Sequence, residues 1–262
     1  MASIADKFEL YEQSVQCPES EIDFVDEQFK TLRKRDASHL REDFCGTAQN
    51  CIEWISRRKS NIAIGIDLDK EVISWCKVNK LDKLRKSQLE KINLIHGDVL
   101  NVKTDKQDLI LATNFSYWCF KERCQLARYF SNVSDCLVED GVFVLDCYGG
   151  YDTYKILSET TEYPGFTYVW EQADFNPVNN HQICHIHYKF SDKSQLDRAF
   201  TYNWRVWSIR EIREILADSG FSQSLVFWQN WDDDVDEAAN DFHVCEKADP
   251  DAGWIAYVVA LK

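Results

Sequence analysis

Between residues 40 and 150, short apolar runs alternate with segments in which apolar residues recur at helical spacing. The segment after residue 46 is an example, because Ala48, Cys51, Ile52 and Ile55 share one helical face. The strand-like runs occupy residues 40–44, 62–66, 92–95, 108–114 and 140–146. This alternation predicts parallel strands joined by crossover helices.

Two helices are predicted ahead of the first strand, at residues 6–16 and 20–35. Ser20 and Asp23 form a variant capping box at the start of the second helix. Its buried stripe is expected to consist of Ile22, Val25, Phe29 and Leu32.

Residues 151–207 do not follow the strand–helix alternation. Turn residues separate three β-rich runs, which predicts an antiparallel meander over residues 166–173, 183–190 and 198–207. Period-two spacing places His185, His187 and Lys189 on the face opposite Ile186 and Tyr188. In the third run, Asn203 and Arg205 oppose a face composed of Phe200, Tyr202, Trp204 and Val206.

The C-terminal part returns to the helix and strand pattern. Ser208 and Glu211 form a capping box, and Gly220 ends the helix that follows. Two closing strands are predicted at residues 225–229 and 254–261. The acidic stretch between them, residues 232–251, is expected to be a solvated loop.

The turn at residues 44–48 is the strongest local signal for a ligand site. Gly46 ends a strand and begins a helix, so it combines free backbone N–H groups with space for close approach. Asp67 ends the next strand, 21 residues later, as 67 − 46 gives. A carboxylate at that position typically holds the ribose hydroxyl groups of a nucleoside.

Five motifs in order resemble those of the class I S-adenosylmethionine-dependent methyltransferases. The first contains Glu42, Cys45, Gly46, Thr47 and Ala48. The others are the segments 65–69, 96–99, 108–114 and 140–146. Phe44 and Ala48 stand where the family usually has glycine.

The resemblance implies S-adenosylmethionine as the cofactor. Asp67 is expected to accept hydrogen bonds from both ribose hydroxyl groups, and Leu68 to lie on the adenine ring. Asp98 is expected to accept a hydrogen bond from the exocyclic amine of the adenine, and the Val99 amide to bond its ring nitrogen. The complete set implied for the cofactor is Tyr11, Glu42, Phe44, Gly46, Asp67, Leu68, Asp98, Val99, Asn114 and Phe115. The alternative for Asp67 is a cap on the helix at residues 70–79. We also expect Asp67→Ala to leave the stability of the unliganded protein almost unchanged.

The fold class expected from the resemblance is α/β. It comprises a Rossmann-like, seven-stranded, mostly parallel sheet with helices on both faces and a small antiparallel insertion. The expected organisation is an N-terminal helical cap, a cofactor-binding core, the insertion, and a closing helix with strands. These parts correspond to residues 1–39, 40–150, 151–207 and 208–262, together forming one compact domain.

Methyl transfer from a sulfonium is an in-line displacement, so a base is needed only when the acceptor is protonated. Our candidates for the acceptor site or a base are Tyr117, His185, His187 and Arg205. Two alternatives stay open. The histidines can be half-exposed strand residues without a role, and the insertion can pair two subunits into a homodimer.

The composition limits the classes of partner that the protein is expected to bind and the cellular compartment in which it is expected. Thirty basic against 44 acidic residues give a net charge of −14, which disfavours tight binding to nucleic acid. Ten cysteines without a CxxC pair indicate a reduced, cytoplasmic protein with no metal site. No apolar run is long enough to span a membrane, and no signal peptide is evident.

These observations favour an enzyme that methylates a small-molecule acceptor. They leave open whether the acceptor atom is oxygen, nitrogen or carbon. The alternatives are a protein or RNA acceptor and a non-catalytic relative that binds S-adenosylmethionine. A nicotinamide-dependent oxidoreductase is disfavoured, because the glycines of a pyrophosphate-binding turn are missing.

Overall fold

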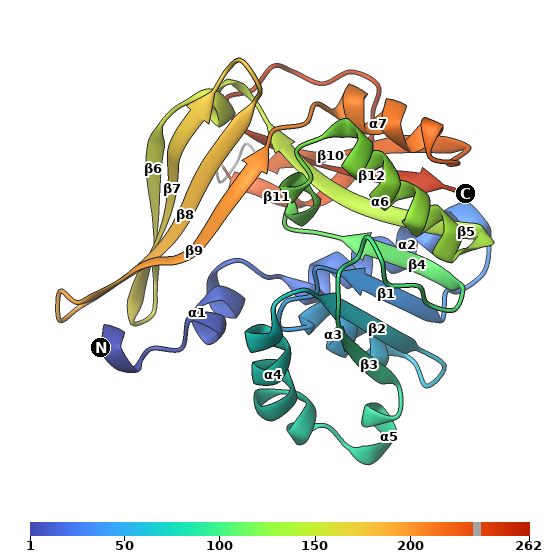
Figure 1. Cartoon of the computed structure of the whole chain (residues 1–262), viewed down its shortest axis with the longest axis horizontal. Helices are drawn as coiled ribbons and strands as arrows, with labels where there is room; N and C mark the ends of the chain where they lie inside the picture. Colours follow the sequence, from blue (N-terminus) through green and yellow to red (C-terminus); the bar gives the residue numbers. More distant parts are fainter. Residues whose placement is uncertain (233–236) are drawn as a thin grey trace.

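The computed structural model describes residues 1–232 and 237–262, and an eight-stranded mixed sheet forms its centre (Figure 1). The strand order is β11-β10-β12-β5-β4-β1-β2-β3. The five parallel strands are β1 (His39–Asp43), β2 (Ile62–Asp67), β3 (Ile92–His96), β4 (Gln107–Ala112) and β5 (Leu137–Gly149). The chain order reverses between β1 and β4, and in such sheets ligands bind beyond the carboxyl ends of the strands at that point.

Helices cover both faces of this sheet, and alternate strand residues divide between two apolar cores. Leu109 and Leu111 of β4 lie in one core, whereas Ile110 and Ala112 lie in the other. The first core contains residues of α2 (Pro18–Arg33), α3 (Gln49–Arg57) and α4 (Lys70–Asn79). The second contains residues of α6 (Arg123–Cys136) and α7 (Ile209–Asp218). The α/β class with helices on both faces is therefore confirmed.

The remaining helices are short. α1 (Lys7–Ser14) precedes α2, and α5 (Lys86–Leu89) lies between α4 and β3. Single 3₁₀ turns occur at η1 (Ala2–Ile4), η2 (Leu81–Lys83), η3 (Ser116–Cys119) and η4 (Tyr151–Tyr154).

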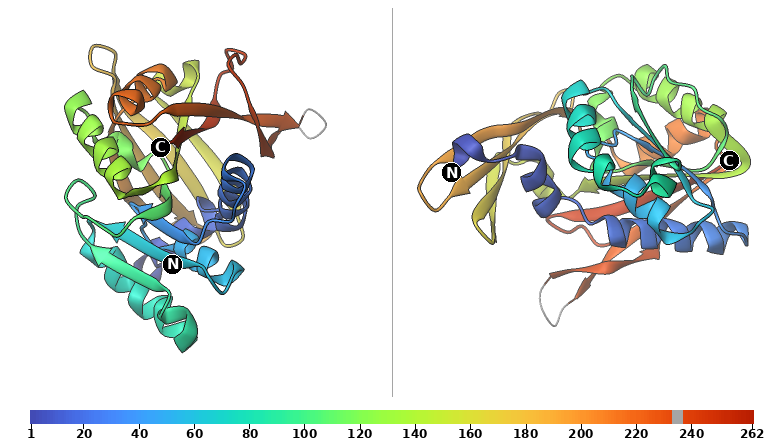
Figure 2. Two further views of the ribbon diagram at one scale, coloured as in Figure 1. Left: turned by 90° about the vertical axis from the view of Figure 1, so that its right-hand side faces the viewer. Right: turned by 90° about the horizontal axis from the view of Figure 1, so that it is seen from below.

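A second, four-stranded sheet projects beside one end of the main sheet, and α1 lies next to it (Figure 2). Its strands follow chain order and are all antiparallel: β6 (Leu157–Tyr163), β7 (Phe166–Asn176), β8 (His181–Phe190) and β9 (Gln195–Arg205). The predicted meander is confirmed for β7 to β9. The sequence analysis missed β6, because its five central residues are exposed and it lacks an alternating pattern.

The main sheet closes with β10 (Gln223–Asp232), β11 (Glu237–Val244) and β12 (Trp254–Leu261). The expectation of a loop over residues 232–251 is wrong for β11, which pairs antiparallel with β10 and is the eighth strand. Residues 233–236 of that stretch lie outside the described residues. Because the sequence of β11 is largely polar, the sequence analysis did not predict this strand at the edge of the sheet.

The start of one helix differs from the expectation, and the cap of another is confirmed. α2 begins at Pro18, two residues before Ser20, and proline suits the first helical position because it has no N–H to satisfy. The capping box at Ser208 and Glu211 is confirmed, with both reciprocal hydrogen bonds present.

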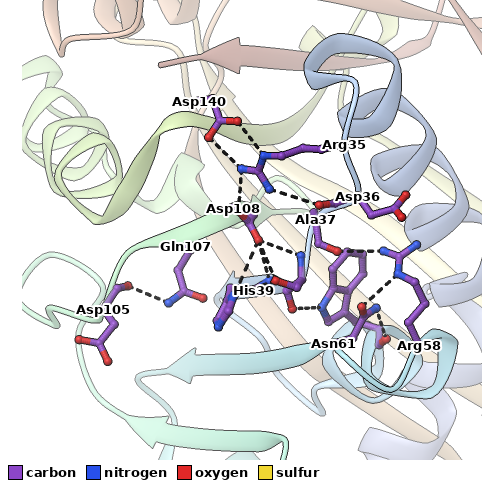
Figure 3. Close-up of polar contacts among 12 residues, drawn as sticks. Arg35, Asp36, Ala37, His39, Arg58, Asn61, Asp105, Gln107, Asp108 and Asp140 are labelled. Carbon is purple, nitrogen blue, oxygen red and sulfur yellow. Dashed lines mark hydrogen bonds and ion pairs between the residues drawn. The ribbon is translucent and has the colours of Figure 1, made fainter.

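Asp108 organises the amino-terminal edge of the parallel strands (Figure 3). Its carboxylate accepts the backbone N–H groups of Ser38 and His39 at 2.8 and 3.0 Å. Arg35 donates to Asp108 at 2.8 Å and also forms an ion pair with Asp140 at 2.7 Å. Asp108 therefore ties the start of β4 to the start of β1. Although burial opposes it, this hydrogen bonding and the Arg35 charge hold the pKa of Asp108 below its usual value.

We expect Asp108→Asn to lower the free energy of unfolding by about 2–3 kcal/mol, because a largely buried acceptor of several hydrogen bonds is lost. A depressed folded pKa stabilises above the unfolded pKa of about 3.9, and this contribution disappears as the pH falls through the folded pKa. The difference between wild type and variant should therefore shrink below about pH 4. Chemical denaturation at several pH values measures it. Asp105→Asn is the control, since Asp105 is exposed and bonds Gln107 only through its backbone oxygen.

Candidate active site

The turn after β1 has three residues with left-handed backbone conformation. Phe44, Gly46 and Ala48 have φ angles of 57°, 51° and 58°. A Cβ atom placed on Gly46 would meet no atom within 4 Å, so open space lies beside this residue. The Phe44 ring packs against Phe120 and Tyr129. The turn therefore presents the backbone at Gly46 while it buries the neighbouring side chain.

Asp67 at the end of β2 holds this turn in place. Its Oδ2 accepts the Gly46 N–H at 2.8 Å, and its Oδ1 accepts the Asp69 N–H at 2.8 Å. Burial raises the pKa of Asp67, and the two backbone donors counteract this effect. The cap of α4 is Asp69, which accepts the Glu71 N–H, so Asp67 is not the helix cap. Each Asp67 oxygen keeps a further lone pair for a ligand.

The other residues predicted for the nucleoside follow β2 and β3. Leu68 is 69% exposed, as a residue that meets a ligand must be before binding. Asp98 accepts the Leu100 N–H at 2.9 Å and the side-chain amide of Asn101 at 3.0 Å. Val99 is buried, and its carbonyl accepts a hydrogen bond from Asn132. Asp67 and Asp98 therefore lie at the ends of adjacent parallel strands.

A second strained turn follows β4. Asn114 and Phe115 have φ angles of 57° and 56°, and both backbone N–H groups donate to Asp146 of β5, at 2.7 and 2.9 Å. Left-handed conformation costs about 1–2 kcal/mol for each residue with a side chain, so Asp146 stabilises an otherwise unfavourable turn. Burial raises the pKa of Asp146 to about 8.

Glu42 belongs to a buried polar group that α2 completes. Asn50 donates through Nδ2 to Glu42 at 3.1 Å and to Glu21 at 2.7 Å. Burial raises the pKa of Glu42 to about 8 and also raises that of Glu21. Asn50 is 4% exposed, yet its Oδ1 receives no hydrogen bond within the described part of the chain. The group therefore has more acceptors than donors.

α1 lies between α4 and β9 (Figure 1). Trp75 of α4 donates to Asp6 at 2.5 Å, and Thr47 donates to Gln16 at 3.2 Å, so both ends of the N-terminal segment are fastened to the core. The Tyr11 ring packs on Phe200 of β9 with centroids 4.9 Å apart. A cap over the cofactor at Tyr11 stays a prediction.

We call the face of the β6–β9 sheet that packs on α1 and the main sheet the inner face. Ile186, Tyr188 and Tyr202 on this face pack with Leu10 and Tyr11 of α1. Towards the main sheet, the aromatic contacts continue through Trp170, Tyr202, Trp204 and Trp118. The inner face is thus an aromatic wall beside the carboxyl end of β4.

His185 and His187 point away from the inner face, as the predicted alternation requires. His185 bonds Thr201 at 2.9 Å, and His187 contacts Asp197 at 2.5 Å and Glu171 at 3.0 Å. These contacts lie on the face of the β6–β9 sheet that is opposite the inner face. The geometry therefore does not favour contact between these histidines and an acceptor.

The other two acceptor-site candidates are also held by the protein itself. Tyr117 is fully buried, and its hydroxyl group donates to the Asp146 carbonyl at 2.8 Å. Arg205 donates to the Lys121 carbonyl and to Glu211, both at 3.0 Å, and stacks 3.6 Å from the centre of the Trp207 ring. Tyr117 therefore joins η3 to β5, and Arg205 joins the end of β9 to Lys121 and to α7. A catalytic role for either residue stays a prediction.

The sequence analysis missed the carboxylates Glu21 and Asp146 and the aromatic residues of the inner face as site residues. Asp146 was visible as a polar residue at the end of an apolar strand, as Asp67 was. Glu21 carried no signal, because its position depends on how α2 packs against α3. No group of three or more His, Cys, Asp or Glu residues is arranged as a metal site in residues 1–232 and 237–262.

No protein-family model and no curated protein sequence matches this chain. Solved structures do match its fold. An S-adenosylmethionine-dependent methyltransferase from Clostridium acetobutylicum is similar with a TM-score of 0.70 and 16% identity, over 97% of this chain and 96% of the other.

Two further matches are enzymes that act on sugars. An amino pentose methyltransferase from Micromonospora echinaspora has a TM-score of 0.67 and 12% identity, with 96% and 94% of the two chains covered. A sugar N-methyltransferase from Streptoalloteichus has a TM-score of 0.65 and 15% identity, with 98% and 93% covered. The chain therefore has the Rossmann-like fold of S-adenosylmethionine-dependent methyltransferases, including the antiparallel insertion.

The contacts of Asp67 change the expectation for its removal. Because Asp67→Ala deletes two charge-assisted hydrogen bonds to backbone N–H groups, we now expect the unliganded protein to lose about 1–3 kcal/mol. At about 2–4 °C per kcal/mol, its melting temperature should fall by about 2–12 °C. Differential scanning calorimetry without ligand measures this, with the exposed Asp82→Ala as control. An unchanged melting temperature would show that the turn at Gly46 holds without Asp67.

Proposed function

We propose that this chain is an enzyme that transfers a methyl group from S-adenosylmethionine to a small-molecule acceptor. The observation that carries the proposal is the turn at Gly46, which combines open space, a free helix start and the adjacent Asp67 carboxylate at the point of strand-order reversal. The fold shared with known methyltransferases supports it.

The residues present suit this cofactor. When bound, it supplies an electrophilic methyl group on a sulfonium. Asp67 and Asp98 offer carboxylate oxygens to the ribose and the adenine, and Leu68 offers an exposed apolar surface. The unsatisfied Oδ1 of Asn50, beside Glu42, suits a positively charged amino group such as that of the methionine part.

We further propose that the acceptor atom is an amine nitrogen. Glu21 of α2 shares the Asn50 side chain with Glu42, and Asp146 accepts the N–H groups of the turn after β4, so both carboxylates lie beside the turns where the strand order reverses. A carboxylate beside an aromatic wall can hold a cationic amine and accept the proton that this amine must lose before its nitrogen can be methylated. Two of the structurally similar enzymes act on an amino pentose and on a sugar nitrogen, which supports this class of acceptor.

Macromolecular acceptors and a non-catalytic role are the alternatives. The net charge of −14 argues against an RNA acceptor. A non-catalytic relative would keep Asp67 and Asp98, so an activity assay separates it. The sequence-based domain division, with residues 151–207 forming part of the acceptor site, remains part of this proposal.

The cellular location of the protein and its assembly into a homodimer are also part of the proposal. No helix among the described residues is both long and apolar enough to cross a bilayer. All ten cysteines are unpaired, which supports a cytoplasmic location. β6 is an edge strand with exposed side chains, and such an edge can pair with a second copy, which supports a homodimer.

The cofactor assignment predicts micromolar binding of S-adenosylhomocysteine and no comparable binding of NAD. Gly46→Ala should weaken S-adenosylhomocysteine at least about tenfold, because a Cβ enters the space needed for close backbone approach. Isothermal titration calorimetry measures both ligands.

Gly165→Ala is a matched control for this test. Gly165 also has a positive φ, and a Cβ there also meets no atom within 4 Å, but it lies in the turn between β6 and β7. Equal weakening by the two variants, or tighter binding of NAD than of S-adenosylhomocysteine, would refute the assignment.

The acceptor assignment predicts that the transferred methyl group is found on nitrogen. Incubation with trideuteriomethyl S-adenosylmethionine and a cell metabolite extract, followed by mass spectrometry, identifies the labelled product. Glu21→Gln should reduce its formation about tenfold or more, because the charge that holds the amine is lost. His187→Gln, which changes the opposite side of the sheet, should retain activity. A product methylated on oxygen or carbon would contradict the amine class.

A further inference from the structure

A shallow cavity of about 280 Å³ that is open to solvent and lined mostly by exposed residues lies away from the candidate active site, between the end of α3 and the α5 segment. Five of its lining residues are cationic, namely Arg57, Arg58, Lys59, Arg85 and Lys91. Two serines and a glutamine add hydrogen-bonding groups, and no carboxylate lines the cavity. This composition is unusual in a chain with 14 more acidic than basic residues.

The cavity is at the opposite edge of the sheet from the candidate active site. Lys59 lies three residues before β2, and Lys91 immediately precedes β3, so both are near the amino ends of these strands. Asp67 ends β2 at the other edge. A strand of six residues spans about 20 Å, which separates the two sites.

The cations of the cavity divide into paired and unpaired groups. Arg57 forms ion pairs with Asp23 at 2.8 Å and Glu53 at 2.5 Å, and Arg58 pairs with Asp26 at 2.6 Å. Lys59, Arg85 and Lys91 form no ion pair in the part of the chain that the structure describes; the Lys91 Nζ only approaches the Arg58 carbonyl at 3.4 Å. Three uncompensated positive charges therefore share one small cavity.

Helix chemistry explains only part of this arrangement. Basic residues stabilise the carboxyl end of a helix through its dipole, and this accounts for Arg57 and its two successors at the end of α3. Arg85 and Lys91 come from the separate segment between α4 and β3, where Lys91 follows the carboxyl end of the short α5 but Arg85 stands at its amino end, at which the dipole disfavours a cation.

We propose that this cavity binds the diphosphate group of a small molecule. Arg85 supplies a planar donor group suited to phosphate oxygens, and Lys59 and Lys91 supply point charges. The hydroxyl groups of Ser56 and Ser87 provide further donors. The cavity is slightly smaller than a typical drug-sized pocket of about 300–1,000 Å³, which suits a diphosphate rather than a large organic ligand. The source is either free inorganic diphosphate or a nucleotide.

Calorimetry with inorganic pyrophosphate tests the proposal, and ADP forms the second arm. Titrations use protein saturated with S-adenosylhomocysteine, so that the adenosine part of ADP cannot bind in the candidate active site. We expect a submillimolar Kd for at least one ligand in dilute salt, and weaker binding as salt is added. Tighter binding of ADP than of pyrophosphate assigns a nucleotide as the source, and the reverse assigns free diphosphate.

The double variant Arg85→Gln/Lys91→Gln should weaken binding at least about tenfold, because two of three unpaired cations are removed. Ser87→Glu, which places a carboxylate in the cavity, should do the same. The matched control is Lys77→Gln/Lys189→Gln, which removes the same charge from exposed lysines outside the cavity. Thermal unfolding verifies that all variants are folded. Absence of binding up to about 10 mM of either ligand, or equal affinity of the cavity variants and the control, overturns the proposal.

Discussion

The hydrogen bond from the Gly46 N–H to the Asp67 carboxylate is the contact on which the candidate active site depends. β1 and β2 are adjacent parallel strands, so the carboxylate that ends one lies beside the turn that ends the other. The turn needs support, because three of its residues have left-handed conformation and two of them carry side chains. Fixing the turn leaves its open side free for a ligand.

The same arrangement recurs on the other side of the point where strand order reverses. Asp146, three residues before the end of β5, accepts two N–H groups from the turn after β4, as Asp67 accepts the Gly46 N–H of the turn after β1. β1 and β4 are neighbours, and each is supported by a carboxylate from the next strand outward. Asp108 fastens the same two strands at their amino ends. β1 and β4 are therefore fastened through carboxylates at both of their ends, which suits a site that must position two reacting molecules.

Parts of the fold and of the candidate site could be predicted where the sequence pattern that determines them lies within a short stretch of the chain. The turn at Gly46 and the carboxylate at Asp67 are encoded within about 20 residues, and together with the other motifs in order they carried the resemblance from which the fold class was predicted. β6 and β11 were missed because edge strands with polar side chains lack the alternation that marks a half-buried strand. Glu21 was missed for another reason. It reaches Asn50 only after α2 packs on α3, and the sequence does not encode that packing locally.

The insertion shows how a correct pattern led to a doubtful assignment. Alternation correctly separated the histidines from the aromatic residues of β8, but it does not indicate which face turns towards the core. Histidine drew attention because it titrates near neutral pH. Apolar area decides the orientation instead, since burying tyrosine and tryptophan rings against α1 and the main sheet removes far more apolar surface from water than burying imidazoles. The two histidines therefore lie opposite the inner face, and the aromatic residues of β8 and β9 face α1 and the main sheet.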